Sequence, residues 1–205
     1  MLFRKKNAGT GTAASGAVDF IIAGLGNPGK KYGGTRHNAG FIMMEALAER
    51  LEVKVDRVRF KSYCGEARAG GRHVLLLMPQ TFMNASGEAV RDAMQFYKIP
   101  PERTLILFDD ISLPVGTLRI RRKGSDGGQK GMRSIITLTG SDQFPRIKMG
   151  VGKKPHPDYD LADWVLSRFT DEEAVKIRDA AYQAADAAQL IVGNQLDEAM
   201  NRFSK

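Results

Sequence analysis

The chain of 205 residues has few of the side chains that form covalent or metal cross-links. Its single cysteine, Cys64, excludes an internal disulfide and is typical of a reducing, cytoplasmic setting. Its three histidines, His37, His73 and His156, are too few and too scattered to make a metal site with one cysteine. No apolar run approaches the length of a membrane span. The sequence therefore predicts a cytoplasmic protein without a disulfide, a metal or a membrane anchor.

The first residues lack the apolar core of a signal peptide. Residues 1–17 begin with basic residues and are otherwise small and polar, so we predict a flexible tail there. No repeat or linker follows, and the composition, with 42% hydrophobic and 26% charged residues, is that of a globular protein. We predict one domain over residues 18–205 and, without a coiled-coil seam, a monomer.

Acidic residues are scarce in one part of the chain. Residues 115–154 contain ten Lys and Arg but only Asp126 and Asp142, a net charge of +8, which equals the net charge of the whole chain. A basic patch of one sign is typical of proteins that bind a polyanion. The competing interpretation is a solvated surface that serves only solubility.

Strand-like and helix-like segments alternate along the chain, which favours an α/β fold with helices on both faces of a sheet. A link of hairpin length, "DISLPVG", joins the strands expected at 104–109 and 116–122 and argues against a purely parallel sheet. We predict a single-domain, three-layer fold with a mixed central β-sheet. The remaining strands are expected at 18–24, 55–63, 73–78 and 145–151.

Helices are predicted from apolar residues at helical spacing. Asn84 or Ser86 is the expected N-cap of the second helix, and Thr170 or Asp171 that of the last. The proline-rich segment 152–161 is either a lid over a site or a plain connector. The helices are expected at 38–51, 84–99, 131–140, 162–169 and from 171 to 192.

A glycine-rich loop, "GLGNPG", follows the first predicted strand. It satisfies the dinucleotide pattern G-x-G-x-x-G, which is weak evidence alone. Pro28 stands where the helix of a dinucleotide site would begin, and "KKYGG" then delays that helix. The loop therefore disfavours dinucleotide binding, and we predict no cofactor.

His37 is the candidate catalytic base, because it stands in a polar run at a helix start and can titrate near neutrality. Asp109, at the end of an apolar strand, is the candidate that orients its imidazole. No serine or reactive cysteine is placed as a nucleophile, which leaves an activated water. Asn27, Asn38 and Asn84, each alone typical of a turn or cap, are candidates to hold a substrate or an oxyanion.

Four segments resemble the bacterial peptidyl-tRNA hydrolase family. They are "GLGNPGKKYGGTRHNAGF", "PQTFMNASGEAV", "DDISLPVGTLRIRRKGSDGG" and "FPRIKMGVG". The resemblance runs from about residue 19 to the C-terminal helices. It implies a mixed α/β fold and hydrolysis of the ester that joins a peptide to the terminal ribose of tRNA, on peptidyl-tRNA released early from ribosomes, without a cofactor.

The resemblance also implies a role for individual residues. The family's catalytic histidine corresponds to His37 and its supporting aspartate to Asp109, and the asparagine that distinguishes peptidyl-tRNA from aminoacyl-tRNA corresponds to Asn27. Contacts with the tRNA end correspond to Tyr32, Phe82, Met83 and Asn84, and contacts with tRNA phosphates to Arg121 and Lys148.

One pair of residues departs from the family's pattern. Gln129-Lys130 stands where the family commonly has His-Asn. A lysine has no hydrogen-bond acceptor but can donate to a carbonyl or a phosphate oxygen. We therefore expect Lys130 to contact the substrate in a different way from the asparagine it replaces.

Three other functions compete with this interpretation. The first is a non-catalytic RNA-binding protein on the same fold, for which the Gln129-Lys130 pair is the one argument. The second is a nucleotide-dependent oxidoreductase, which rests on the glycine-rich loop alone. The third is a hydrolase of small esters or peptides, which leaves the basic segment without a role.

Overall fold

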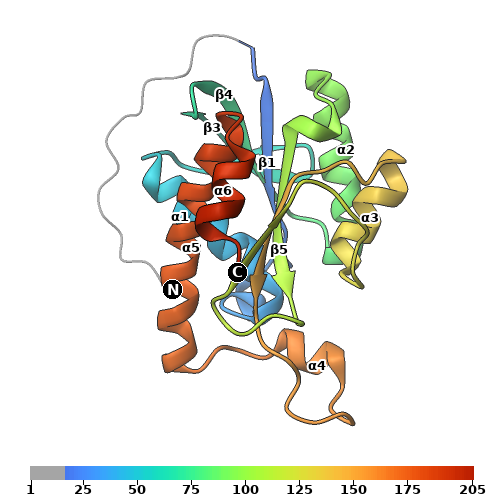
Figure 1. Ribbon diagram of the computed structural model, residues 1–205. Helices are drawn as coiled ribbons and strands as arrows, with labels where there is room; N and C mark the ends of the chain where they lie inside the picture. Colours follow the sequence, from blue (N-terminus) through green and yellow to red (C-terminus); the bar gives the residue numbers. More distant parts are fainter. Residues whose placement is uncertain (1–16) are drawn as a thin grey trace.

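The computed structural model describes residues 17–205, so the predicted tail lies outside the described residues except for Ala17 (Figure 1). Its seven-stranded sheet has the order β2-β3-β4-β1-β5-β7-β6. The four neighbours β4, β1, β5 and β7 are parallel, whereas β2 and β3 on one side and β6 on the other pair antiparallel. This confirms the predicted mixed sheet. The strands are β1 Phe20–Gly24, β2 Arg57–Arg59, β3 Ser62–Ala69, β4 Arg72–Pro79, β5 Thr104–Asp110, β6 Leu118–Arg121 and β7 Arg146–Gly150.

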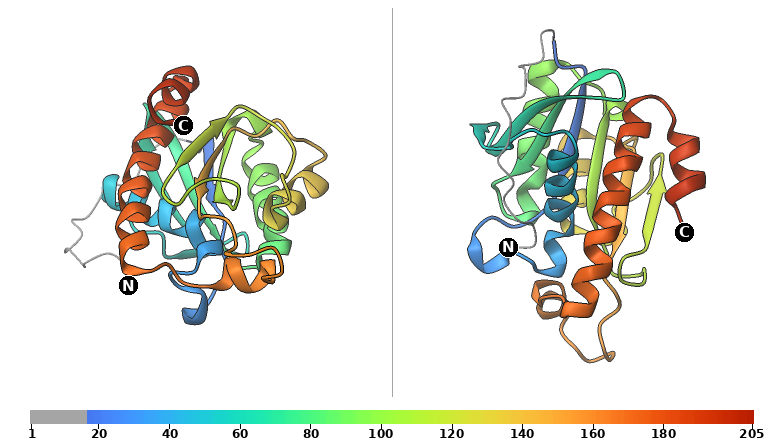
Figure 2. Two further views of the ribbon diagram at one scale, coloured as in Figure 1. Left: turned by 60° about the horizontal axis from the view of Figure 1, so that its bottom comes forward. Right: turned by 90° about the vertical axis from the view of Figure 1, so that its left-hand side faces the viewer.

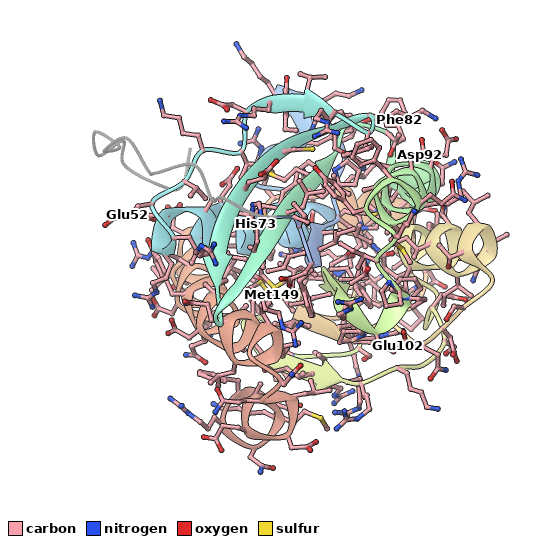
Figure 3. The ribbon with its side chains drawn as sticks, turned by 90° about the horizontal axis from the view of Figure 1, so that it is seen from above. Glu52, His73, Phe82, Asp92, Glu102 and Met149 are labelled. Atoms are coloured by element: carbon pink, nitrogen blue, oxygen red, sulfur yellow. The ribbon has the colours of Figure 1, made fainter. Side chains whose placement is uncertain are left out.

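Helices cover both faces of the sheet and complete the predicted three layers. Helices α2 and α3 lie on one side, and α1, α5 and α6 lie on the other, while α4 sits below the sheet (Figures 1 and 2). Viewed from above, Asp92 of α2 and Glu52, just after α1, lie on opposite sides (Figure 3). The helices are α1 Ala39–Arg50, α2 Ser86–Tyr97, α3 Lys130–Thr139, α4 Leu161–Leu166, α5 Asp171–Val192 and α6 Leu196–Phe203.

Each face of the sheet has its own hydrophobic core, because successive strand residues point to opposite faces. In β1, Ile22 belongs to the core shared with α1 and α5, whereas Ile21 belongs to the core shared with α2 and α3. On α5, small residues such as Ala180 and Ala184 are fully buried, which lets this long helix pack closely beside α1. The helix starts at the predicted cap, where Thr170 forms a capping box with Glu173.

Two strand predictions were wrong in detail. Residues 55–63 form a hairpin rather than one strand, since Phe60 and Lys61 adopt left-handed φ values of 50° and 51° that turn the chain from β2 into β3. The strands at 104–109 and 116–122 do not pair, because β7 lies between them. The link instead crosses the end of β7, where Gly116 N–H donates to the carbonyl of Gly150 at 3.0 Å.

Two helix predictions also need correction. Neither Asn84 nor Ser86 caps α2, because a 3-10 turn over Met83–Ala85 precedes it and Ser86 Oγ donates to the carbonyl of Met83. Helix α6 was not predicted. It packs on β6, and the chain after it reaches the outer edge of that strand, where Lys205 N–H donates to the carbonyl of Leu118.

The parallel strands end at one edge of the sheet, the lower edge in Figure 1. The chain leaves β1 toward α1 on one face and leaves β4 toward α2 on the other face. Loops after the strands diverge at such a reversal, and open α/β sheets bind ligands there. The candidate residues of the loops after β1, β4 and β5 therefore gather at this edge.

Candidate active site

The glycine-rich loop after β1 leads to His37 through two 3-10 turns, Lys30–Tyr32 and Arg36–Asn38, and only then does α1 begin. This is the predicted delay of the helix. Helix α1 packs so closely on the strands that a Cβ on Gly40 would lie 2.4 Å from the backbone of Leu25 and Leu107. The close approach brings His37, in the 3-10 turn that leads into the helix, against the end of β5.

His37 pairs with Asp109, as predicted. Its Nδ1 lies 2.8 Å from Asp109 Oδ2, and the two side chains are only 12% and 3% exposed. With Nδ1–H donated to the carboxylate, the lone pair of a neutral imidazole resides on Nε2. The second carboxylate oxygen, Oδ1, accepts a hydrogen bond from Gln129 Nε2 at 2.9 Å.

Asn27 is buried and held by three hydrogen bonds. Its backbone N–H donates to Asn38 Oδ1, and its carbonyl accepts from Asn38 Nδ2. Its side-chain oxygen accepts from Met83 N–H at 2.8 Å, which fixes the orientation of the amide. The amide nitrogen of Asn27 has no hydrogen-bond partner within residues 17–205, so it remains available as a donor.

The predicted tRNA-end residues lie around this network. Tyr32 and Phe82 meet edge to face with ring centroids 6.4 Å apart, and Phe82 is 58% exposed. Lys31 Nζ lies 4.7 Å from the Tyr32 ring. Met83 is buried, whereas Asn84 is exposed and, within the described residues, makes no side-chain hydrogen bond. The structure thus brings the residues of two distant loops together.

Arg121 and Lys148 lie on the face of β6 and β7 opposite to the one that packs against α1, α5 and α6. Alternation along β6 buries Leu118 and Ile120 and leaves Arg121 exposed. Lys148 of β7 forms an ion pair with Asp110 at 3.3 Å. Burial opposes ionisation of Asp110, but hydrogen bonds from Ser112 and the charge of Lys148 outweigh it, so the pKa of Asp110 lies below its usual value.

The basic segment is less exposed than its composition suggests. Arg146 is fully buried, and its guanidinium donates to the carbonyls of Phe144, Ser125 and Asp142. Arg122 forms an ion pair with Asp197, outside the segment. The predicted patch therefore keeps fewer unpaired charges than the ten counted. Lys130, on the first turn of α3, is exposed and has no ion pair within the described chain.

Arg36, which the sequence analysis missed, ties His37's turn to the C-terminal part of the chain. Its buried guanidinium donates to both carboxylate oxygens of Glu173, at 3.1 and 2.7 Å, and to the carbonyl of Val151 at 2.9 Å. It also stacks on the Trp164 ring at 3.8 Å. The only sequence signal was its position next to His37, since nothing local marks an arginine as buried.

The segment 152–161 lies beside this arginine, next to the turn that carries His37 (Figure 2, left). Trp164 of α4 donates from Nε1 to the carbonyl of Gly152 at 2.9 Å, and Tyr159 packs on the same ring. The segment is therefore anchored to α4, which packs on the turn of His37, and its role as lid or connector stays a prediction.

Within residues 17–205, no group of three or more His, Cys, Asp and Glu side chains is arranged to hold a metal ion. No helix in this part of the chain is long and apolar enough to cross a membrane. The site itself brings together an oriented imidazole, an asparagine donor and exposed cations around them.

A model of the peptidyl-tRNA hydrolase family matches residues 21–205. The chain belongs to this family. Peptidyl-tRNA hydrolases of Caldanaerobacter subterraneus subsp. tengcongensis and Alkaliphilus oremlandii are 53% and 50% identical to it, over 90% of the chain and 99% and 98% of theirs. The crystal structure of the peptidyl-tRNA hydrolase of Acinetobacter baumannii matches with a TM-score of 0.85 at 33% identity, covering 93% of this chain and 97% of that one.

Membership confirms the resemblance, the fold class and the class of enzyme predicted from the sequence. The chain is a hydrolase of a translation-related family, and neither the oxidoreductase nor the non-catalytic RNA-binding protein is favoured. The roles of individual residues remain predictions, which the geometry of the site now makes specific.

Proposed function

We propose that this hydrolase cleaves the ester between the peptide and the terminal ribose of peptidyl-tRNA released early from ribosomes, with His37 as general base. The observation that supports His37 is its bond to the buried Asp109, which directs Nδ1–H to the carboxylate and leaves Nε2 as the basic atom. Free peptide and reusable tRNA are the products.

In the proposed reaction, Nε2 of His37 takes a proton from water while the water oxygen attacks the ester carbonyl. The negative charge of Asp109 stabilises the imidazolium that forms. The tetrahedral intermediate then collapses, the bond to the ribose oxygen breaks, and His37 returns its proton to that oxygen. A free carboxylic acid and a ribose hydroxyl result, and the histidine is regenerated.

Asn27 is proposed to bind a carbonyl oxygen of the substrate. Its side-chain oxygen is occupied by Met83 N–H, so the amide nitrogen is the end that can donate. A peptide, unlike a single amino acid with a free amine, offers a further carbonyl near the ester. One donor at this position would therefore favour peptidyl-tRNA over aminoacyl-tRNA.

The tRNA itself is proposed to bind across the surrounding surface. Tyr32, Phe82, Met83 and Asn84 would receive the terminal nucleotide, since exposed aromatic rings stack on bases. Lys130 would donate to the ribose-phosphate end, and Arg121 and Lys148 would contact backbone phosphates. We further propose a cytoplasmic monomer that needs neither a cofactor nor a metal.

The test is release of labelled N-blocked aminoacyl groups from tRNA in buffer with a chelator. We expect wild type to cleave the blocked ester and spare unblocked aminoacyl-tRNA. His37→Ala should lose about 10²–10⁴-fold in rate, the usual contribution of a general base, while still binding tRNA. The matched control is His73→Gln, near the start of β4 and so away from the carboxyl ends of the strands where His37 lies, which should leave the rate unchanged.

Each outcome bears on the proposal. Full activity of His37→Ala would show that another group is the base. Binding of tRNA by a folded wild type that cleaves nothing would favour the RNA-binding function. Cleavage of small esters at the same rate as of tRNA esters would leave the basic face without a role.

A further inference from the structure

We propose that Gln129 is a positioning residue that holds Asp109 in the orientation in which it pairs with His37. Gln129 thereby keeps Nδ1–H of His37 directed at the carboxylate and Nε2 as the basic atom. This inference rests on the proposed role of His37. It concerns a residue at which the chain departs from its family's usual histidine.

The side-chain amide of Gln129 is buried and has partners at both ends. Its oxygen accepts from Met132 N–H at 2.7 Å, so Gln129 is the N-cap of α3. Its nitrogen donates to Asp109 Oδ1 at 2.9 Å and lies 3.1 Å from Met83 Sδ. The whole residue is only 8% exposed. One amide therefore connects the start of α3 to the carboxylate behind His37.

The two ends of the amide cannot be exchanged. The N–H of Met132, in the first turn of α3, needs an acceptor, and only the amide oxygen provides one. The amide nitrogen is thus the end that faces Asp109. The first turn of α3 packs directly on Met83. The approach is so close that a Cβ on Gly131 would lie 2.6 Å from Met83 Sδ. The donor is therefore presented to Asp109 by a rigid element.

Asp109 needs such a donor because its side chain is only 3% exposed. One carboxylate oxygen bonds His37 and the other bonds Gln129. Two donors on two oxygens fix the rotation of the carboxylate. Without the second donor, a buried oxygen would lack a partner, and the carboxylate would be free to turn away from His37.

Gln129 does this without adding a charge near His37. Other ionisable groups around the pair already have partners: Arg36 is bound to Glu173, and Asp110 of β5 is bound to Lys148 of β7. Two further groups are Lys130 on α3, which is exposed, and Tyr32 on the first 3-10 turn. A new negative charge at position 129 would therefore act mainly on Asp109 and, through it, on His37.

The test compares three variants in kcat/KM for blocked aminoacyl-tRNA between pH 5 and 9. Gln129→Glu keeps an oxygen for Met132 N–H, and so keeps the helix cap, but replaces the donor with a second carboxylate. That charge favours the protonated imidazole, so we expect the acidic limb of the profile to move up by about one pH unit or more. At pH 7 the rate should fall about tenfold to a hundredfold, a part of what the base contributes.

Gln129→Ala removes both ends of the amide. We expect a similar fall in kcat with little change in KM, together with a lower midpoint of urea unfolding because the cap is lost. Gln129→His should keep most of the activity above pH 7, since a neutral imidazole has one donor and one acceptor. The matched control is Gln95→Glu on the exposed surface of α2, which should change neither rate nor profile.

A residue that only caps α3 would give a different pattern. Gln129→Glu would then be as active as wild type with an unchanged profile, and this result would overturn the proposal. Failure of the proposed base is distinguishable, because in that case His37→Ala would retain activity whatever the Gln129 variants do. A loss in Gln129→Glu that appears only in KM would also contradict a positioning role.

Discussion

Replacement of Arg36 by lysine should destabilise the fold far more than the same replacement at another arginine that joins the same two parts of the chain. Arg36 is 4% exposed in its side chain and donates to Glu173, Val151 and Ser167. A lysine keeps the charge but has neither the flat fork nor the stacking surface. Its single nitrogen cannot reach all four acceptors, so about two of the four bonds are lost.

The magnitude follows from the bonds lost. A hydrogen bond to a charged group contributes about 1.5–3 kcal/mol. Loss of two such bonds, partly offset by the new ammonium, gives about 3 kcal/mol. For a chain of this size 1 kcal/mol lowers Tm by about 2–4 °C, so Arg36→Lys should lower Tm by about 6–12 °C.

The assay is thermal unfolding followed by circular dichroism, with urea midpoints as a second measure. Arg50→Lys is the control, since Arg50 of α1 pairs with Asp186 of α5 at 3.0 Å and both side chains are 44% exposed. Exposed pairs contribute about 0–1 kcal/mol, so its Tm should fall by no more than about 4 °C. Equal shifts in the two variants would refute the argument that burial makes the Arg36 bonds strong.

Three further predictions concern charge, acid and the thiol. Arg121→Gln should lower the slope of log Kd for tRNA against log salt concentration by about one. Arg57→Gln, on the opposite edge strand, should leave that slope unchanged. If the two variants have the same slope, Arg121 does not contact tRNA phosphates. Burial opposes ionisation of Glu173, but the bonds from Arg36 and Thr170 hold its pKa below the usual value. A lowered pKa adds stability above the unfolded value of about 4.3 that is lost as the pH falls through the folded value. Glu173→Gln should therefore flatten the acid side of the curve of urea midpoint against pH, and parallel curves would contradict this. Burial raises the pKa of the Cys64 thiol to about 11, so iodoacetamide at pH 8 should modify native protein about 10²-fold more slowly than unfolded protein; equal rates would show that the thiol is accessible.

The sequence predicted most of what lies at the ends of the strands. Apolar runs marked the strands. Asp109 at the end of one strand, and Asn27 and His37 in the segment after another, are brought together by the structure. Such residues are recognisable because open α/β folds bind ligands at the carboxyl ends of their strands. The mixed sheet was predicted correctly, but from an expected hairpin between the strands at 104–109 and 116–122, which do not pair in the structure.

What the sequence could not show depends on partners far along the chain. The link after β5 looked like a hairpin because its length suits one, yet β5 is already paired with β1 and β7. The sequence marked Gln129 only as a departure from the family's usual histidine. Its contacts could not be predicted, because glutamine is not a favoured N-cap and its amide nitrogen donates to a residue 20 positions away. The bond of Arg36 to Glu173 could not be predicted either, because the two residues are 137 positions apart in the sequence.

The bonds from the last two residues to β6 have a consequence for association between molecules. An edge strand with free N–H and C=O groups is a template on which another chain can form a strand, and this is a common route to aggregation. On β6, Lys205 N–H occupies the carbonyl of Leu118, and Ser204 Oγ accepts from Ile120 N–H. The strand that carries Arg121 is thus kept from pairing edge to edge with a second molecule, while its basic face stays open.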